Sequence, residues 1–231
     1  MRFSCEKAIL LSAINTASRA VSPKSSIPAL EGLLLQANSR LTISGYNMQT
    51  GIRTAVDASV TEDGCLAVNA RLFGDMIRRL PDDVVSFSCD SSLNITLICG
   101  DASYNMTAIP ADDYPDLPEV EDEYSVSISQ RLLKTMIGET SFAVSTNEAR
   151  PVHTGSLFEI EEQSLTVVSV DGFRLALRRE KLENSGSGAF RFVAPGSALN
   201  EVEKICGDAD APASITLGSR HLLFEVGPTQ L

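Results

Sequence analysis

One pattern of residues occurs twice in the chain. It is FSCEKAILLSAINTASRAVSPKSSIPALEG at residues 3–32 and VSISQRLLKTMIGETSFAVSTNEARPVHTG at residues 126–155. The two copies align without a gap, and matching residues lie 123 positions apart. The matches are Leu10 with Leu133, Ile14 with Ile137, Ala20-Val21-Ser22 with Ala143-Val144-Ser145, Pro28 with Pro151 and Gly32 with Gly155. An ordered set of matches indicates an internal repeat. The sequence therefore predicts two domains of similar fold.

Helical and strand-like periodicities alternate within each copy. Apolar residues recur at helical spacing over roughly residues 5–20, 70–80, 129–142 and 196–206. Strand-like stretches bounded by turn residues cover 33–36, 41–44, 51–56, 84–89, 93–99 and 104–109 in the first copy. Two helices and an antiparallel meander per copy predict an α+β fold, in which the helices pack on one face of the sheet.

An acidic, proline-containing segment at residues 110–125 separates the copies. Its three prolines disfavour regular structure and its seven acidic residues favour exposure to solvent. We expect a first domain over residues 1–120 and a second over residues 121–231. In the second copy only five residues follow the strand-like stretch 222–226, so we expect this domain to lack its last strand and the chain to be a fragment of a longer protein.

The composition excludes several classes of protein. The 231 residues are 43% hydrophobic, as in a globular core, and the net charge of −11 argues against a nucleic-acid binder that relies on bulk positive charge. The longest apolar runs, such as Ala8–Leu11, are too short to span a bilayer, and the charged start argues against a secretory signal. Five cysteines without a C-x-x-C pair predict reduced thiols in a cytosolic protein, and two histidines leave no multi-histidine metal site.

Positive charge is concentrated on the predicted helices. They carry a net charge of +3, and the rest of the chain carries −14. Arg71 and Arg78 are expected to project away from a buried stripe of Leu72, Met76 and Leu80. The basic residues on the helices are Lys7, Arg19, Arg71, Arg78, Arg79, Arg131, Lys134 and Lys204. This segregation predicts a basic inner surface that contacts phosphates without reading bases.

Four motifs resemble those of a known family. They are Ser26–Gly32 (SIPALEG), Ala108–Pro115 (AIPADDYP), Glu148–Gly155 (EARPVHTG) and Ser169–Ala176 (SVDGFRLA). In this order they are similar to the bacterial DNA polymerase III beta subunit, the replicative sliding clamp. The resemblance covers the whole chain and implies the first clamp domain and most of the second, with the third domain absent. A full-length member would form a head-to-tail homodimeric ring that encircles double-stranded DNA and tethers the polymerase.

The resemblance also implies DNA contacts. Lys24, in the loop after the first helix, and Asn147, in the matching loop of the second copy, are expected to contact DNA by position. The charge argument alone adds Arg71, Arg78, Arg79, Arg131, Lys134 and Lys204. After Pro195 the family often has basic residues, whereas this chain has Gly196 and Ser197, and no DNA contact is expected there.

A peptide-binding pocket is implied at the junction of the second and third domains. It would receive short motifs from the polymerase catalytic subunit, the clamp loader and repair proteins. The wall contributed by this chain maps to His153, Thr154, Gly155, Val170, Asp171, Gly172, Phe173, Arg174 and Leu175. Asp171-Gly172 is also a hairpin turn signal, and a turn that displays Phe173 can form a pocket wall. Because the other wall belongs to the absent domain, we expect weak peptide binding.

The family's dimer contact maps to the first domain. It would involve the strand that carries Tyr104 and Met106 and the helix that carries Leu72 and Met76. Without the partner domain, we expect the fragment to be monomeric or to associate in a non-native manner. The resemblance implies no catalytic residues, no cofactor and no metal, and a cytoplasmic bacterial location at the nucleoid during replication.

Two other functions compete with the clamp. An enzyme is disfavoured, because the sequence has no G-x-S-x-G, P-loop, H-E-x-x-H or dinucleotide motif, and neither His153 nor His221 has an evident nucleophile as its partner. The glycine-rich stretch Asn184–Gly188 is read as a flexible loop, since no helix follows it directly. The remaining alternative is a scaffold of tandem α+β repeats without a role on DNA.

Overall fold

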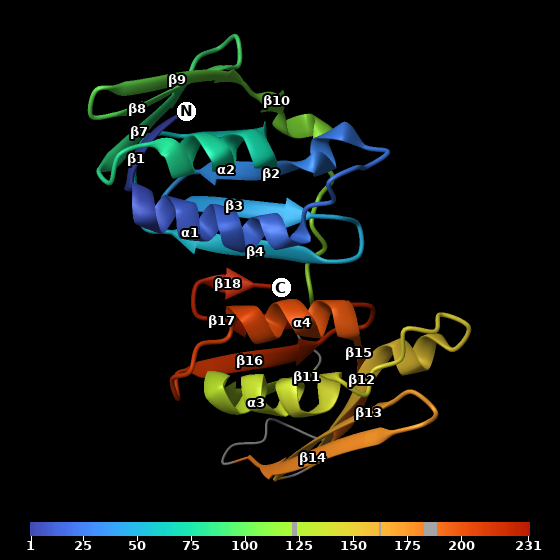
Figure 1. Cartoon of the computed structure of the whole chain (residues 1–231). Coiled ribbons are helices and arrows are strands. Elements are labelled where there is room, and N and C mark those ends of the chain that lie inside the picture. Colours follow the sequence, from blue (N-terminus) through green and yellow to red (C-terminus); the bar gives the residue numbers. More distant parts are fainter. Residues whose placement is uncertain (122–123, 162, 183–188) are drawn as a thin grey trace. The chain divides into compact units, whose positions relative to one another are not determined.

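The computed structural model describes residues 1–121, 124–161, 163–182 and 189–231, and it divides the chain into two compact units (Figure 1). The first unit comprises Met1–Leu117 together with Pro228–Gln230, and the second comprises Pro118–Gly227 with Leu231. The loop expected at Asn184–Gly188 lies outside the described residues. Each unit has its own hydrophobic core.

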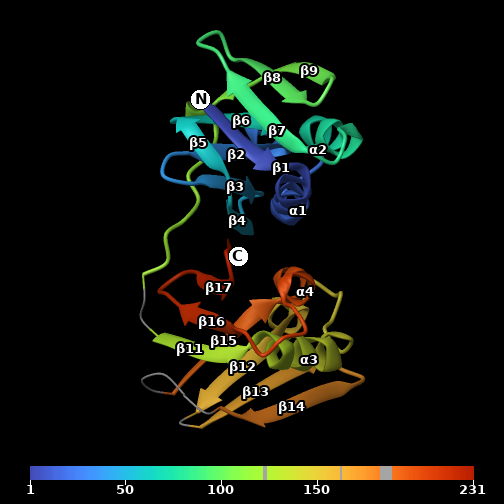
Figure 2. The same ribbon diagram turned by 90° about the vertical axis from the view of Figure 1, so that its left-hand side faces the viewer.

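The first unit places two neighbouring helices on one side of its antiparallel strands (Figure 2). The helices are α1 (Lys7–Ala17) and α2 (Ala70–Arg79), with short 3-10 helices η1 (Ser18–Ala20), η2 (Pro28–Glu31) and η3 (Ala111–Asp113). The strands are β1 (Arg2–Glu6), β2 (Gly32–Ala37), β3 (Leu41–Tyr46), β4 (Gly51–Val56), β5 (Ser59–Glu62), β6 (Gly64–Asn69), β7 (Val84–Cys89), β8 (Asn94–Cys99), β9 (Ala102–Thr107) and β10 (Ile109–Pro110). One sheet has the order β5-β1-β7-β8-β9, and the other runs β10-β6-β2-β3-β4.

The second unit repeats this plan. Its helices are α3 (Gln130–Ser141) and α4 (Gly196–Ile205), with the 3-10 helix η4 (Pro151–Thr154). Its strands are β11 (Tyr124–Ser129), β12 (Gly155–Glu161), β13 (Ser164–Val170), β14 (Leu175–Lys181), β15 (Phe190–Pro195), β16 (Pro212–Leu217) and β17 (Leu222–Val226). They form a four-stranded sheet, β14-β13-β12-β15, and the row β17-β16-β11. These antiparallel sheets with paired helices confirm the predicted α+β fold.

The core of the first unit explains where α2 begins and which face it buries. The Asn69 side chain caps the helix by accepting a hydrogen bond from the Leu72 amide at 2.9 Å. Phe73 and Ile77 are fully buried, and Phe73 meets the ring of Phe87 edge-on at 6.3 Å. Ala70 and Gly74 complete the buried face of the helix. The expected buried stripe is therefore wrong for two of its three residues, because Leu72 is 46% exposed and Met76 is only half-buried. Leu80 is buried, as expected.

The second core is built in the same way. The Ser129 hydroxyl accepts a hydrogen bond from the Leu132 amide at 3.2 Å and caps α3. Leu133 and Ile137 are fully buried on α3. At the centre of this core, the ring of Phe158 stacks on Phe192 at 5.2 Å and meets Phe224 edge-on at 6.4 Å.

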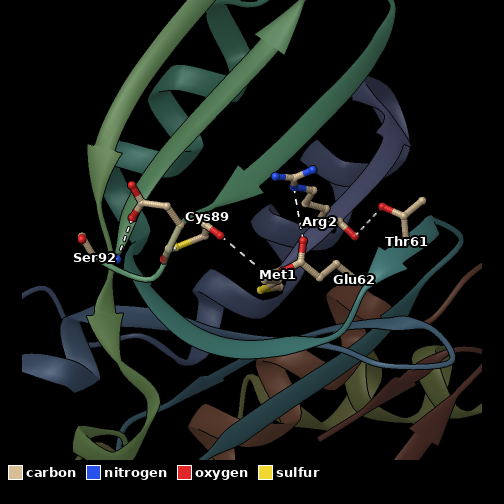
Figure 3. Close-up of polar contacts among 7 residues, drawn as sticks. Met1, Arg2, Thr61, Glu62, Cys89 and Ser92 are labelled. Carbon is tan, nitrogen blue, oxygen red and sulfur yellow. Dashed lines mark hydrogen bonds and ion pairs between the residues drawn. The ribbon is translucent and has the colours of Figure 1, made fainter.

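Strand β1 was not expected, because its last two residues, Cys5 and Glu6, lie inside the range 5–20 predicted as a helix, and no strand was predicted before that helix. It is an interior strand, paired with β5 and β7. Figure 3 shows how its start is held: the Met1 amine donates to the Cys89 carbonyl at 3.4 Å, the Glu62 carboxylate pairs with Arg2 at 3.2 Å, and the Arg2 carbonyl accepts a hydrogen bond from Thr61. These partners are distant in the sequence, so local periodicity does not reveal them.

One further expectation needs correction. The segment 110–125 contains β10, η3 and the start of β11 where no regular structure was expected. After β17, Thr229 and Gln230 form a two-residue strand, β18, which pairs with β4 and is grouped with the first unit. Strand β18 is therefore not the last strand of the second domain, and the absence of that strand stays a prediction. None of the described helices is long and apolar enough to cross a membrane.

Replacing Phe158 with alanine should lower the free energy of unfolding by about 3–5 kcal/mol, because the substitution leaves a cavity among buried rings. Urea unfolding followed by circular dichroism measures the change. The matched control is Phe173→Ala in the same unit, where the ring is fully exposed and the change should stay within ~0.5 kcal/mol. Equal losses in the two variants would contradict this description of the core.

Candidate DNA-contacting helices and peptide-binding face

The exposed side of α2 separates basic from apolar residues. At ~100° per residue, Arg71 and Arg78 lie on one flank of the buried face, and Leu72 and Met76 lie on the other flank. Arg79 lies opposite the buried face and is exposed. Helix α2 therefore presents a basic flank to solvent beside α1, its neighbour in the first unit (Figure 2).

Four of the expected DNA-contacting cations already have carboxylate partners. The pairs are Arg78 with Asp75 (2.7 Å), Arg131 with Asp210 (2.8 Å), Lys134 with Asp208 (2.6 Å) and Lys204 with Glu201 (2.6 Å). Within the part of the chain that the structure describes, no such pair is recorded for Lys24, Arg71 or Arg79, and all three are exposed. The uncompensated cations among the expected residues thus belong to the first unit.

The charge balance of the two helix pairs differs accordingly. Helices α1 and α2, η1 and the turn Pro81–Asp83 hold five basic and three acidic residues. Helices α3 and α4 with the turn Gly207–Ala211 hold three basic and five acidic residues. The basic bias expected on the helices therefore persists in the first unit and is reversed in the second once the turns are included.

The two loop residues expected at DNA lie in matching places after α1 and α3. Lys24 is exposed in the segment that precedes η2. Asn147 is exposed in the segment that precedes η4, where its side-chain oxygen accepts a hydrogen bond from the Ala149 amide at 3.0 Å. Both loops leave these side chains accessible to a ligand.

The hairpin between β13 and β14 holds its turn rigidly. The Asp171 carboxylate accepts hydrogen bonds from the Phe173 and Arg174 amides at 3.0 and 3.1 Å and pairs with the Arg174 guanidinium at 2.8 Å. The backbone hydrogen bond from Phe173, assisted by those from Arg174, lowers the pKa of Asp171. Gly172 has φ +94°, which favours glycine, and the Arg174 guanidinium lies 5.7 Å from the Phe142 ring centroid. The turn therefore projects Phe173 fully into solvent.

The other expected pocket residues lie at the start of β12 and beside the same hairpin. His153 and Thr154 end η4 and are half-buried, and the Thr154 hydroxyl donates to the Pro151 carbonyl at 2.8 Å. Gly155 follows, and a Cβ there would lie 2.3 Å from the Ala194 carbonyl oxygen, so the position requires glycine. Val170 pairs with Leu175 across β13 and β14.

An apolar row that the sequence analysis missed extends this surface. Val193, Leu157, Val168 and Leu177 are directly paired across β15, β12, β13 and β14. Leu177 is 57% exposed, and Leu175, two residues earlier on β14, is 63% exposed. The available signal was that β13 carries apolar residues on both faces, with Leu165 and Val167 on one and Val168 and Val170 on the other, which is typical of a strand with apolar neighbours on both sides. We call Val193, Leu157, Val168, Leu177, Val170 and Leu175 the open face.

The equivalent face of the first unit is covered. In the first unit the residues that pair across the corresponding strands β6, β2, β3 and β4 are Ala67, Leu34, Ser44 and Arg53. Leu30 and Tyr114 pack with Leu34 and Ala67 in a separate buried cluster, and Leu117 packs against it. In the first unit, residues 111–117 of the same chain therefore cover the sheet face that is exposed in the second unit.

The residues expected at a dimer contact divide into two kinds. Strand β9 is the edge of its sheet, pairing only with β8 in the described part of the chain. Met106, however, is 8% exposed and belongs to the first core, and Tyr104 packs against that core. Their side chains point inward because they alternate with exposed Ser103 and Asn105 on a half-buried strand. Met106 therefore faces the core, while Leu72 is exposed and the backbone edge of β9 is unpaired in the described part of the chain. The dimer contact itself stays a prediction.

Two buried cysteines, Cys5 and Cys206, carry protonated thiols at neutral pH. Burial raises the pKa of Cys5 and of Cys206 to about 11, since removal from water disfavours the thiolate. Among the described residues, no group of three or more histidine, cysteine, aspartate or glutamate side chains is arranged to hold a metal ion.

Two repeated units, each with an adjacent helix pair packed on antiparallel strands, have the architecture of a DNA-clamp fold. The family model for the N-terminal domain of the DNA polymerase III beta subunit matches residues 1–118. The family model for the central domain of the same subunit matches residues 127–231. The chain belongs to this family, the bacterial beta sliding clamps.

Individual relatives agree with this assignment. The beta sliding clamp of Staphylococcus epidermidis is 31% identical over 98% of this chain. A putative DNA polymerase III beta subunit from Eubacterium rectale superposes on the whole chain with a TM-score of 0.94 at 33% identity, and the sliding clamp of Bacillus subtilis does so with 0.94 at 28% identity. The chain spans 62% of the first relative's length and 63% of that of each solved structure.

Replacing Tyr114 with phenylalanine should remove part of the alkaline loss of stability. Burial raises the pKa of Tyr114 to about 12, whereas a tyrosine in an unfolded chain titrates near pH 10. Between these pH values only the unfolded state releases the proton, so the free energy of unfolding falls as the pH rises. Urea unfolding at about pH 9 and about pH 11 should show a smaller fall for Tyr114→Phe than for the wild type. The same fall in both proteins would mean that Tyr114 is not buried on this face.

Proposed function

We propose that the chain forms the first domain and most of the second domain of a sliding clamp that encircles duplex DNA and tethers the replicative polymerase. The observation that supports this most directly is the pair of matching units, each with adjacent helices whose outer sides carry exposed cations. In the family's ring the helices line the hole. The acidic remainder of the chain then repels DNA from other surfaces.

The proposed DNA contacts are of unequal strength. Lys24, Arg71 and Arg79 are exposed cations without a recorded acidic partner in the described residues, so they are available to phosphates. Arg78, Arg131, Lys134 and Lys204 must exchange a carboxylate for a phosphate before they contribute. Asn147 contributes a neutral polar contact. Such contacts meet the uniform backbone, so binding is indifferent to sequence and depends on salt.

Replacing both Arg71 and Arg79 with alanine should reduce the slope of log affinity against log salt for duplex DNA by about 1.8, because each phosphate contact contributes about 0.9. Fluorescence anisotropy of a labelled duplex, titrated at several salt concentrations, measures the slope. The matched control is Arg40→Ala with Arg220→Ala, which removes the same charge from exposed turns outside the helices. If the control reduced the slope equally, the helices would not be the DNA-contacting surface.

The open face supports the second part of the proposal, which is the binding of short peptide motifs from the polymerase catalytic subunit, the clamp loader and repair proteins. In the first unit the matching face is filled by a short segment of the chain that contributes Tyr114 and Leu117. A short peptide with apolar side chains is therefore the kind of ligand that this type of face accepts. Phe173, Leu175 and the Asp171 turn form its rim beside His153 and Thr154.

Replacing Leu175 with aspartate should weaken binding of a synthetic clamp-binding peptide from a replicative polymerase by at least tenfold, because a charge would enter the apolar surface. Isothermal titration calorimetry or chemical-shift perturbation measures the affinity, which is expected to be weak. Ile98→Asp serves as the control, since Ile98 is an exposed strand residue of the first unit. Unchanged affinity in Leu175→Asp would remove the open face as the peptide site.

Assembly into a head-to-tail dimeric ring with a third domain is also proposed. Strand β4 accepts β18 along one edge, and its counterpart β14 pairs only with β13 in the described residues. The edge of β14 could pair in the same way with a strand of a following domain. The proposed dimer contact is formed by the β9 edge, exposed Leu72 and half-buried Met76. The proposed location is the bacterial cytoplasm at the nucleoid.

A further inference from the structure

In both units the turn after the second helix caps the start of the first helix. In the first unit the Lys7 amide, at the start of α1, donates to the Asp83 carbonyl at 3.1 Å. In the second unit the Gln130 and Arg131 amides, at the start of α3, donate to the Ala211 and Ala209 carbonyls at 2.9 and 3.2 Å. These contacts satisfy helix amides that have no partner inside the helix. We call Gly207–Ala211 the acidic turn.

The same turns place carboxylates on cations of the first helix. In the first unit the Lys7 ammonium lies 2.8 Å from the Asp82 carboxylate. In the second unit the Arg131 guanidinium donates to both oxygens of Asp210 at 2.8 and 3.0 Å, and the Lys134 ammonium lies 2.6 Å from Asp208. The arrangement thus occurs in both copies, and on α3 it neutralises both basic residues of the helix.

The acidic turn is held in place without its carboxylates. Besides the two caps, the Gly207 amide donates to the Gln130 side-chain oxygen at 3.0 Å, and the Gln130 side-chain nitrogen donates to the Pro212 carbonyl at 3.3 Å. The carboxylates themselves are mostly exposed, at 67% for Asp210 and 87% for Asp208. Exposed ion pairs of this kind contribute little to stability. The backbone therefore fixes the position of two acids whose charge the fold does not need.

We propose that Asp208 and Asp210 limit the affinity of α3 for DNA, because their carboxylates compete with the DNA phosphates for Arg131 and Lys134. This inference rests on the proposed function, in which Arg131 and Lys134 face duplex DNA. A cation that already has a carboxylate partner gains little from a phosphate, because the phosphate must displace that partner. The hydrogen bond from Lys134 lowers the pKa of Asp208, so the competitor stays ionised at neutral pH. The second unit then contacts DNA weakly, while Arg71 and Arg79 of the first unit hold it more strongly.

The test is the variant Asp208→Asn with Asp210→Asn, which keeps the shape of both side chains and removes their charge. Duplex DNA affinity is measured by anisotropy between about 50 and about 200 mM salt. Freeing two cations should steepen the slope of log affinity against log salt by about 1.8, so that the affinity lost over this range grows by about tenfold. Each single variant should give about half the change in slope, and circular dichroism should show an unaltered fold.

The matched control is Asp112→Asn with Asp113→Asn, which makes the same change in net charge at exposed residues outside the helix pairs. The control should leave the slope nearly unchanged. An equal change in both double variants would overturn the inference, because net charge alone would explain it. In a background of Arg131→Ala and Lys134→Ala, the change produced by Asp208→Asn and Asp210→Asn should disappear, and its persistence would also overturn the inference.

The outcomes separate this inference from the proposed function. A wild-type chain whose DNA affinity depends on salt, combined with an unchanged slope in Asp208→Asn and Asp210→Asn, contradicts the inference alone. A wild-type chain without salt-dependent binding to duplex DNA, unaltered by Arg71→Ala and Arg79→Ala, contradicts the proposed function and this inference with it.

Discussion

The packing of an adjacent helix pair against antiparallel strands is the constraint on which the rest of the molecule depends. In each unit the buried faces, led by Phe73 and Ile77 or by Leu133 and Ile137, decide which residues remain outside. Because the apolar side of each helix is committed to the core, the polar side is presented as one surface beside its neighbour. Under the proposed function, this polar surface is the one that contacts DNA.

Charge on that surface is adjusted by elements other than the helices. The turns after α2 and α4 place carboxylates at the starts of α1 and α3 through backbone hydrogen bonds. In the proposed sliding ring, contacts with phosphates should be many and individually weak, and compensation of helix cations by fixed acids meets that requirement. The two units differ in this respect: in the described part of the chain Arg71 and Arg79 of the first have no ion pair, whereas the helix cations Arg131, Lys134 and Lys204 of the second are paired.

The repeated fold also produces a second surface that differs between the two units. The rows through Leu34 and Leu157 have the same pairing across four strands, yet the first is covered by the segment that carries Tyr114 and the second is open. A repeated fold thus uses this face for internal packing in one unit and leaves it exposed in the other. The physical difference is which chain segment lies over the sheet.

From the sequence alone, the repeat and its periodicities were enough to predict the α+β class and the position of all four helices to within a few residues, because helix and strand periods are local properties. Family motifs located the Asp171 turn in the same way. Strand β1, the inward orientation of Met106, the covering of one sheet face and the open state of the other required the tertiary structure. So did the pairing of Lys134 with Asp208, which lie 74 residues apart, since no pattern of neighbours records which distant charges the fold brings together.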